Sequence, residues 1–272
     1  MMEHLSKVKI AMRQRERGQA FVELLLIMPI LLIVIAGMVD VVFAFNDYLQ
    51  MLDGARNGAR DSANLNPYPN AISAYDTNLS CASGVSGTKN FFRRTACNTE
   101  SFLKPIDIRI EAPPPYNGST CIDRSVPADA DKFINDIVIS IFTTAVVDVG
   151  GVQTLELKRF DNNVYNGGNP YLQEDLDDSG WSFMMDQYQS PNKRGMCSQL
   201  QKDTNIRPLL LGDTVAANSA PNTAYLLVEV FFRHYQLFDL PAFGDVIQNP
   251  IPLHAYAIFS LAAAEATPTP EP

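Results

Sequence analysis

Residues 21–45 read FVELLLIMPILLIVIAGMVDVVFAF, and the sixteen residues from Leu24 to Val39 carry no charge. As one helix the stretch is about 37 Å long at about 1.5 Å per residue, which exceeds the roughly 30 Å of a bilayer core. A helix in a soluble core rarely stays apolar on every face over such a length. The sequence therefore predicts a single membrane-spanning helix.

Charge is distributed unevenly on the two sides of this stretch. The first 18 residues hold five Lys or Arg against two Glu, whereas residues 46–62 hold three Asp against two Arg. Because Lys and Arg accumulate in short cytoplasmic flanks of membrane helices, we expect the N-terminus inside and everything after Phe45 outside. A cleaved secretory signal is disfavoured, because the apolar run is too long and continues into FNDYLQ.

The remainder of the chain is large and acidic. The 272 residues are 46% hydrophobic and carry a net charge of -9, of which the first 18 residues contribute +3 and the remaining 254 contribute -12. Such a composition supports a domain with a substantial core. An acidic surface repels phosphate backbones, and no basic patch interleaved with aromatic residues follows, so nucleic-acid binding is not expected.

Four cysteines follow the apolar stretch, and none lies in a CxxC or other metal-ligand spacing. Three pairings are possible among them. In an exported domain an even number indicates two disulfides, while four buried free thiols would fit a cytosolic domain. We predict disulfides among Cys81, Cys97, Cys121 and Cys197.

One carboxylate lies at the start of the apolar run. Glu23 is the fifth residue after Gly18, in the stretch RERGQAFVE. A carboxylate at the edge of a membrane helix costs a few kcal/mol unless it is paired or reaches the interface. Glu23 either extends toward the cytoplasmic headgroups or serves another purpose.

The combination of a basic leader, a glycine and a glutamate five residues later resembles the prepilin peptidase site of type IV pilins and pseudopilins. The resemblance implies cleavage after Gly18, which would leave Gln19 as the new N-terminus. It also implies that Glu23 pairs with the terminal amine of a neighbouring subunit. Such pairing would convert an expensive charge into a device that sets register.

A longer stretch, RERGQAFVELLLIMPILLIVIAGMVD followed by YLQMLDGARNGARDSA, resembles the TadE-like family of the tight-adherence (Tad) pilus system. The resemblance implies a pseudopilin or minor pilin that acts in the assembly or structure of an adhesive Tad pilus. Its implied partners are other pilin subunits, prepilin peptidase, the Tad assembly platform and membrane lipid. The residues that carry it are Glu23, Pro29, Gly37, Asp40 and the stretch 54–60.

Two residues inside the helix have local consequences. Pro29 removes one backbone hydrogen bond and is expected to kink the helix. Asp40 occupies a position where the family often has an acidic residue, and we expect it near the outer interface, where it stays hydrated.

The helix is expected to continue beyond the membrane. Apolar and small residues recur at three- and four-residue steps from Phe45 to Ala63, which predicts a pilin-like stalk. Gly54 and Gly58 share one face and allow close approach of another helix. That helix belongs either to another subunit or to the chain's own domain.

Beyond Asn64 the pattern predicts strands rather than helices. We expect an α+β fold in which the stalk packs on a mostly antiparallel sheet with a loop-rich insertion at about residues 150–222. The last strand pair resembles that of TadE-like proteins, whereas the insertion has no recognised counterpart. The domains are a leader at 1–18, helix and stalk at 19–63, the exported domain at 64–262 and a flexible tail at 263–272. The predicted strands are Ile106–Ala112, Asp136–Val149, Thr154–Phe160, Ala224–Phe238 and Leu253–Ala262.

Catalysis is not expected. The chain has three histidines, and His234 within EVFFRHYQL is interpreted as a structural residue. GxSxG, HExxH, Walker A and GxGxxG patterns are absent, and the sequence order offers no nucleophile with a base and an orienting group.

One local pattern suggests calcium, and no other cofactor is expected. Residues 175–186 match an EF-hand loop at positions 1, 3, 5, 6 and 12, although Asp replaces the usual Glu at position 12 and DLDDSG is also a good solvated turn. The alternative function is a membrane-anchored binding module or adhesin whose insertion binds calcium, glycans or another protein. The calcium ligands would include Asp175, Asp177, Ser179 and Asp186.

Overall fold

A computed structural model provides the fold, and the chain divides into two compact units. The first unit comprises residues 1–46 and 235–251, and the second comprises residues 47–234 and 252–272. The structure describes residues 2–65, 81, 91–106, 121–124, 132–159, 180–184, 195–200, 202–211, 224–238 and 249–261. Within these ranges it describes the side chains from Phe21 onward, except those of residues 105, 143–149, 152–156, 158–159, 202–203 and 211.

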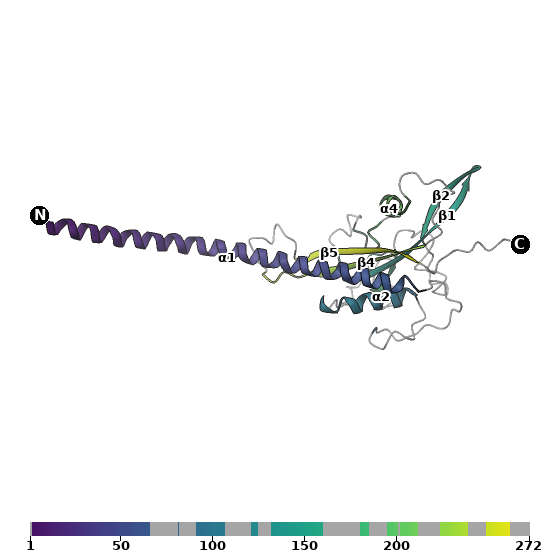
Figure 1. The fold of residues 1–272 in the computed structure, drawn as a ribbon, viewed down its shortest axis with the longest axis horizontal. Helices are drawn as coiled ribbons and strands as arrows, with labels where there is room; N and C mark the ends of the chain where they lie inside the picture. The colour runs from purple at the N-terminus through teal and green to yellow at the C-terminus, as the bar shows by residue number, and fades with distance from the viewer. Residues whose placement is uncertain are drawn as a thin grey trace. The chain divides into compact units, whose positions relative to one another are not determined.

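A single helix, α1 (Met2–Ser62), contributes to both units (Figure 1). Pro29 lies inside it. From Asp47 onward α1 belongs to the second unit, where Met51, Ala55 and Ala59 are fully buried. The predicted continuation of the helix is confirmed, and its last turns form part of a core.

A second helix, α2 (Phe91–Phe102), packs on the small-residue face of α1 (Figure 1). A Cβ built on Gly58 would clash with Thr99, whose Cα would lie only 2.8 Å away. A Cβ built on Gly54 would clash with the side chain of Leu103, just after α2. Of the two partners that the sequence left open for this face, the structure therefore shows the chain's own domain.

The sheet has the order β2-β1-β4-β5. Strand β1 pairs antiparallel with β2 through residues 142–149 and with β4 through residues 136–142. A two-residue strand, β3, pairs with β1 at Val138 and Ile139. The strands are β1 (Asp136–Val149), β2 (Val152–Arg159), β3 (Trp181–Ser182), β4 (Ala224–His234) and β5 (Ile251–Leu261).

A two-glycine turn joins β1 to β2. Gly150 and Gly151 have φ angles of 67° and 86°, and Val149 pairs with Val152 across the turn. Two successive positive φ angles match the right-handed twist of a hairpin, and glycine adopts them without a steric penalty.

Side chains alternate between the two faces of the sheet, as their period of two requires. One face of β1 and β4 packs against α1 and α2. The other face packs against segments from residues 122–206, including Ile122, Met196 and Ile206. The residues that face the helices include Ile137, Ile139, Ile141, Leu226, Val228 and Val230.

Most predicted strands are confirmed. Strand β1 has the predicted limits, β2 and β5 are displaced by one or two residues, and β4 ends four residues early, at His234. The prediction for Ile106–Ala112 is wrong at Ile106, which ends a 3-10 helix (Lys104–Ile106), and residues 107–112 lie outside the described residues. Pro105 inside KPI and the preceding helix favour a turn there.

Helix α2 was not predicted, because it has few strong helix formers and its buried residues include the polar Arg93, Thr95 and Thr99. Within it Phe91, Phe92, Ala96 and Cys97 are buried. Short elements of this kind gain most of their stability from packing rather than from propensity.

Both predicted disulfides are present. Cys81 bonds to Cys97, which ties residue 81 to α2. Cys121 bonds to Cys197, beside the parallel bridge between Ile122 and Met196. The structure thus selects one of the three possible pairings.

We expect Gly58→Ala to destabilise the second unit by about 1–3 kcal/mol, because the added methyl meets the backbone of α2. Gly54→Ala should cost less, because it meets only the end of the Leu103 side chain. Gly37→Ala is the matched control, since nothing lies within 4 Å of that position. Thermal unfolding of the detergent-solubilised chain, followed by the near-ultraviolet circular dichroism of Trp181, ranks the three variants by stability. Equal losses of stability in Gly58→Ala and Gly37→Ala would contradict the packing of α2 against Gly58.

Candidate functional site

Among the described residues, the apolar part of α1 exposes many large hydrophobic side chains. Its most apolar 18-residue window has a mean hydropathy of 2.8 and is only 6% buried. By length and composition this helix, and no other in the described part of the chain, is able to cross a membrane. Its large exposed side chains include Phe21, Leu24, Leu25, Leu26, Ile27, Ile30, Leu32, Ile35, Met38, Val41 and Val42.

The predicted processing residues lie at the start of this surface. Gly18 and Gln19 are within the helical backbone of α1, and Glu23 is exposed one turn further on. The helix continues through all three positions. Their roles stay predictions, since they concern events that involve other proteins.

Asp40 has an environment that the sequence did not indicate. Its side chain is only 8% exposed, and it accepts hydrogen bonds from the backbone amides of Leu237 at 3.0 Å and Phe238 at 3.4 Å. The expectation that Asp40 stays hydrated is corrected: amides of a segment 197 residues away take the place of water. The contact lies entirely within the first unit.

A second polar contact involves α1 in the other unit. The Nδ1 atom of His234 lies 2.7 Å from Oδ2 of Asp47, and the His234 side chain is 7% exposed. This pair joins the end of β4 to α1 at Asp47, where the second unit begins. It supports the structural interpretation of His234.

The face of the sheet opposite the helices contains two buried acids that sequence reasoning missed. The first, Asp136, accepts hydrogen bonds from the amides of Ile137, Met184 and Met196 at 2.8–3.0 Å and from the Ser182 hydroxyl at 2.6 Å. Burial raises the pKa of its carboxyl from 3.8 to about 6, although all four donors favour the charged form. Asp136 thereby holds two segments of the predicted insertion on β1.

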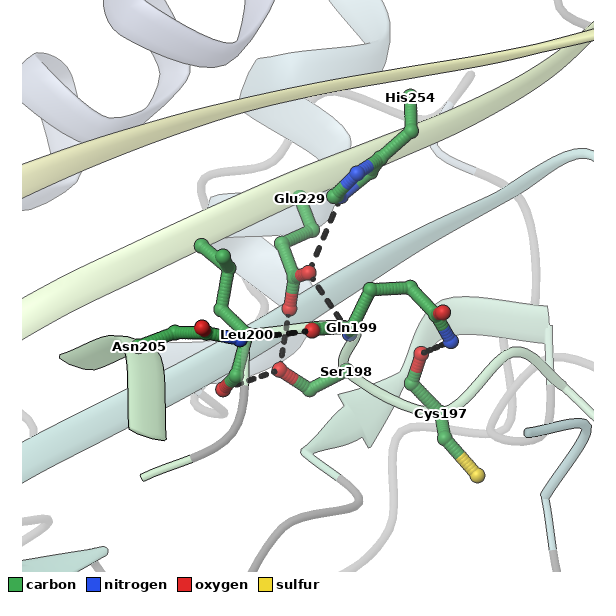
Figure 2. Close-up of polar contacts among 7 residues, drawn as sticks. All are labelled: Cys197, Ser198, Gln199, Leu200, Asn205, Glu229 and His254. Carbon is green, nitrogen blue, oxygen red and sulfur yellow. Dashed lines mark hydrogen bonds and ion pairs between the residues drawn. The ribbon is translucent and has the colours of Figure 1, made fainter. Parts of the chain in front are cut away.

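The second acid, Glu229, has the same role on β4 (Figure 2). Its carboxylate is fully buried and accepts hydrogen bonds from the Ser198 hydroxyl at 2.5 Å and the Gln199 amide at 2.9 Å. The Nε2 atom of His254 lies 3.1 Å from the same carboxylate, and its ring stacks on Phe231 at 4.6 Å. The available signal was a lone acid within an apolar strand, as in YLLVEVFF.

The order of these groups differs from that of a catalytic triad. A triad needs the imidazole between the hydroxyl and the acid, so that the ring accepts the hydroxyl proton. Here the carboxylate lies between the serine and the histidine, and the hydroxyl donates to the acid (Figure 2). The arrangement provides hydrogen-bond partners for the buried Glu229 carboxylate, which would otherwise be costly to bury.

Metal binding has little support among the described residues. Cys81, Cys97 and Glu100 form a cluster of suitable atom types, but the two sulfurs are joined in a disulfide and are not thiolate ligands. The predicted calcium ligands Asp175, Asp177, Ser179 and Asp186 lie outside the described residues, and the calcium site stays a prediction.

The described residues combine an exposed apolar N-terminal helix, long enough to cross a membrane, with a disulfide-bonded α+β unit, an organisation consistent with a membrane-anchored pilin-like protein. Residues 18–60 match the family model described as TadE-like protein. The match covers 43 of the 272 residues and shows that this segment of the chain is similar to TadE-like proteins. The chain matches no curated protein and no solved structure.

The raised pKa of Asp136 has a measurable consequence. Because the folded state holds this proton more tightly than the unfolded chain, the penalty of the buried charge is present above pH 6 and is relieved as the pH falls from about 6 to about 4. The free energy of unfolding therefore increases by about 3 kcal/mol as Asp136 becomes protonated.

We therefore expect the stability of Asp136→Asn to fall further behind that of the wild type as the pH drops from 7 to 4. The variant lacks the titrating carboxyl. In addition, its side-chain NH2 group would face the Ser182 hydroxyl or the Met196 amide, which are themselves hydrogen-bond donors. Asp53→Asn, at an exposed position of α1, controls for loss of charge. A constant difference across this pH range in thermal unfolding would contradict the prediction.

Proposed function

We propose that the chain is a TadE-like pseudopilin or minor pilin that acts in the assembly or structure of an adhesive Tad pilus. The observation that carries the proposal is the exposed apolar part of α1, which begins at Phe21, three residues after Gly18, and contains Glu23. A surface of this kind requires lipid or other apolar helices around it.

The proposed life cycle begins in the cytoplasmic membrane, with the N-terminus inside and the second unit outside. Two disulfides support an oxidising location for that unit. Prepilin peptidase cleaves after Gly18, and the chain then meets the Tad assembly platform through its helix.

Assembly with other pilin subunits uses the helix between Phe21 and Phe45. The glycine face at Gly54 and Gly58 is covered by the chain's own α2, so that face does not serve intersubunit contact. Glu23 pairs with the amine of Gln19 in a neighbouring subunit, which neutralises both charges in apolar surroundings. The role of the chain is structural rather than enzymatic.

Intact-mass analysis of protein from membranes and from sheared filaments tests the processing step. We expect the wild type to begin at Gln19 and Gly18→Leu to retain Met1. Gly37→Leu is the matched control, because it adds the same side chain at a position with open space and leaves the cleavage site intact. A wild-type N-terminus at Met1 in both fractions would overturn the proposal in favour of an anchored binding module or adhesin.

The proposed pairing of the Glu23 carboxylate with a neighbouring amine is tested separately. We expect Glu23→Gln to be cleaved normally yet to be lost from the filaments or to reduce their number, because the amine loses its ionic partner. Glu16→Gln changes a carboxylate that cleavage removes, so it should behave as the wild type. A normal number of filaments with the Glu23→Gln variant would contradict the pairing hypothesis without affecting the proposed cleavage after Gly18.

A further inference from the structure

The segment that follows β4 exposes large apolar side chains. Tyr235, Leu237 and Phe238 are 59%, 66% and 41% exposed. They lie in the first unit, together with the apolar part of α1. The amide of Gln236 donates to Oδ1 of Asn249 at 3.3 Å, which ties the start of the connection between β4 and β5 to its end.

Asp40 holds this segment against α1. One carboxylate oxygen of Asp40 accepts from the amide of Leu237 at 3.0 Å, and both oxygens lie 3.4 Å from the amide of Phe238. The carboxylate gains donors and the two amides gain an acceptor. In apolar surroundings an unpaired carboxylate and unpaired amides are both costly. The contact explains how an acid is accommodated between Val39 and Val41.

The position of Asp40 along the helix sets the depth of the segment. Asp40 lies 19 residues after Phe21, or about 28 Å along an α-helix, and a bilayer core is about 30 Å thick. With Phe21 at the cytoplasmic edge of the core, Asp40 reaches its outer edge. Phe43 and Phe45 of α1 are also exposed close to this level. Aromatic and apolar side chains at such a boundary are typical of membrane interfaces.

We propose that residues 235–238 form a second membrane contact, seated in the outer headgroup region of the bilayer that α1 spans and clamped to the helix by Asp40. The inference rests on the proposed function, because it requires α1 to cross the membrane. Its occupant is lipid: the segment is continuous with the apolar surface of α1 through Asp40, and it exposes three large side chains within four residues. The clamp fixes how deep the helix lies and how far it turns about its axis.

Depth-resolved tryptophan quenching tests the proposal on the full chain in phosphatidylcholine vesicles. Trp181 is the only tryptophan and is buried, so the wild type supplies the baseline. In Phe238→Trp we expect the added fluorescence to be quenched more by lipids brominated near the headgroup than by lipids brominated at the chain ends.

Two further variants calibrate the measurement. In Leu31→Trp, at the middle of the apolar helix, the chain-end bromines should quench more strongly. In Tyr256→Trp, at an exposed position of β5, aqueous iodide should quench and neither lipid should.

The clamp is tested by combining Phe238→Trp with a change at Asp40. Asp40→Ala should reduce the quenching by headgroup-side bromines and increase that by iodide, because the two amides lose their acceptor. Asp40→Asn keeps one acceptor oxygen and should fall between Ala and the wild type. Asp53→Ala removes an exposed carboxylate from the same helix and should change nothing.

The outcomes separate the inference from the proposed function. Absence of lipid quenching in Leu31→Trp shows that the helix is not in the bilayer and overturns both. Normal quenching in Leu31→Trp with only iodide quenching in Phe238→Trp overturns the membrane contact alone. If the tryptophan introduced by Phe238→Trp is protected from lipid and iodide together, and dilution of the protein in the vesicles relieves this protection, the surface belongs to a second copy and the membrane contact is also overturned.

Discussion

The close approach of α2 to α1 at Gly54 and Gly58 is the constraint on which the second unit depends. It allows two helices to share one face of the sheet with Met51, Ala55 and Ala59 fully buried between the layers. A side chain at Gly58 would meet backbone rather than a flexible tip. The close contact therefore fixes the helix layer, and with it the surface onto which β1 and β4 pack.

The opposite face of the sheet is organised by charge rather than by close packing alone. Asp136 and Glu229 are buried acids whose oxygens accept hydrogen bonds from segments that start far away in sequence. Each segment would otherwise present unsatisfied amides to an apolar surface, and each acid would otherwise be an unpaired charge. Mutual satisfaction of this kind selects one arrangement of the segments, because any displacement leaves buried polar groups without partners.

The sequence was informative where one local pattern dominates. The apolar run of α1 and the alternation within β1 and β4 need no knowledge of distant residues. Helix α2 and the two-residue β3 were missed because contacts from elsewhere in the chain stabilise them. Asp40 was placed in water because its partners, the amides of Leu237 and Phe238, are separated from it by nearly the whole exported domain.

The last turns of α1 are a layer of the core, and this matters when the molecule bears mechanical load. A domain that hangs from a linker yields first at the linker. Here Asp47 to Ser62 would have to be sheared away from α2 and from the sheet, which would expose Met51 and break the contacts at Thr99 and Leu103. Tension on the second unit would thus be borne by its densest packing, and a cut at Asn64 would remove part of that packing along with the helix.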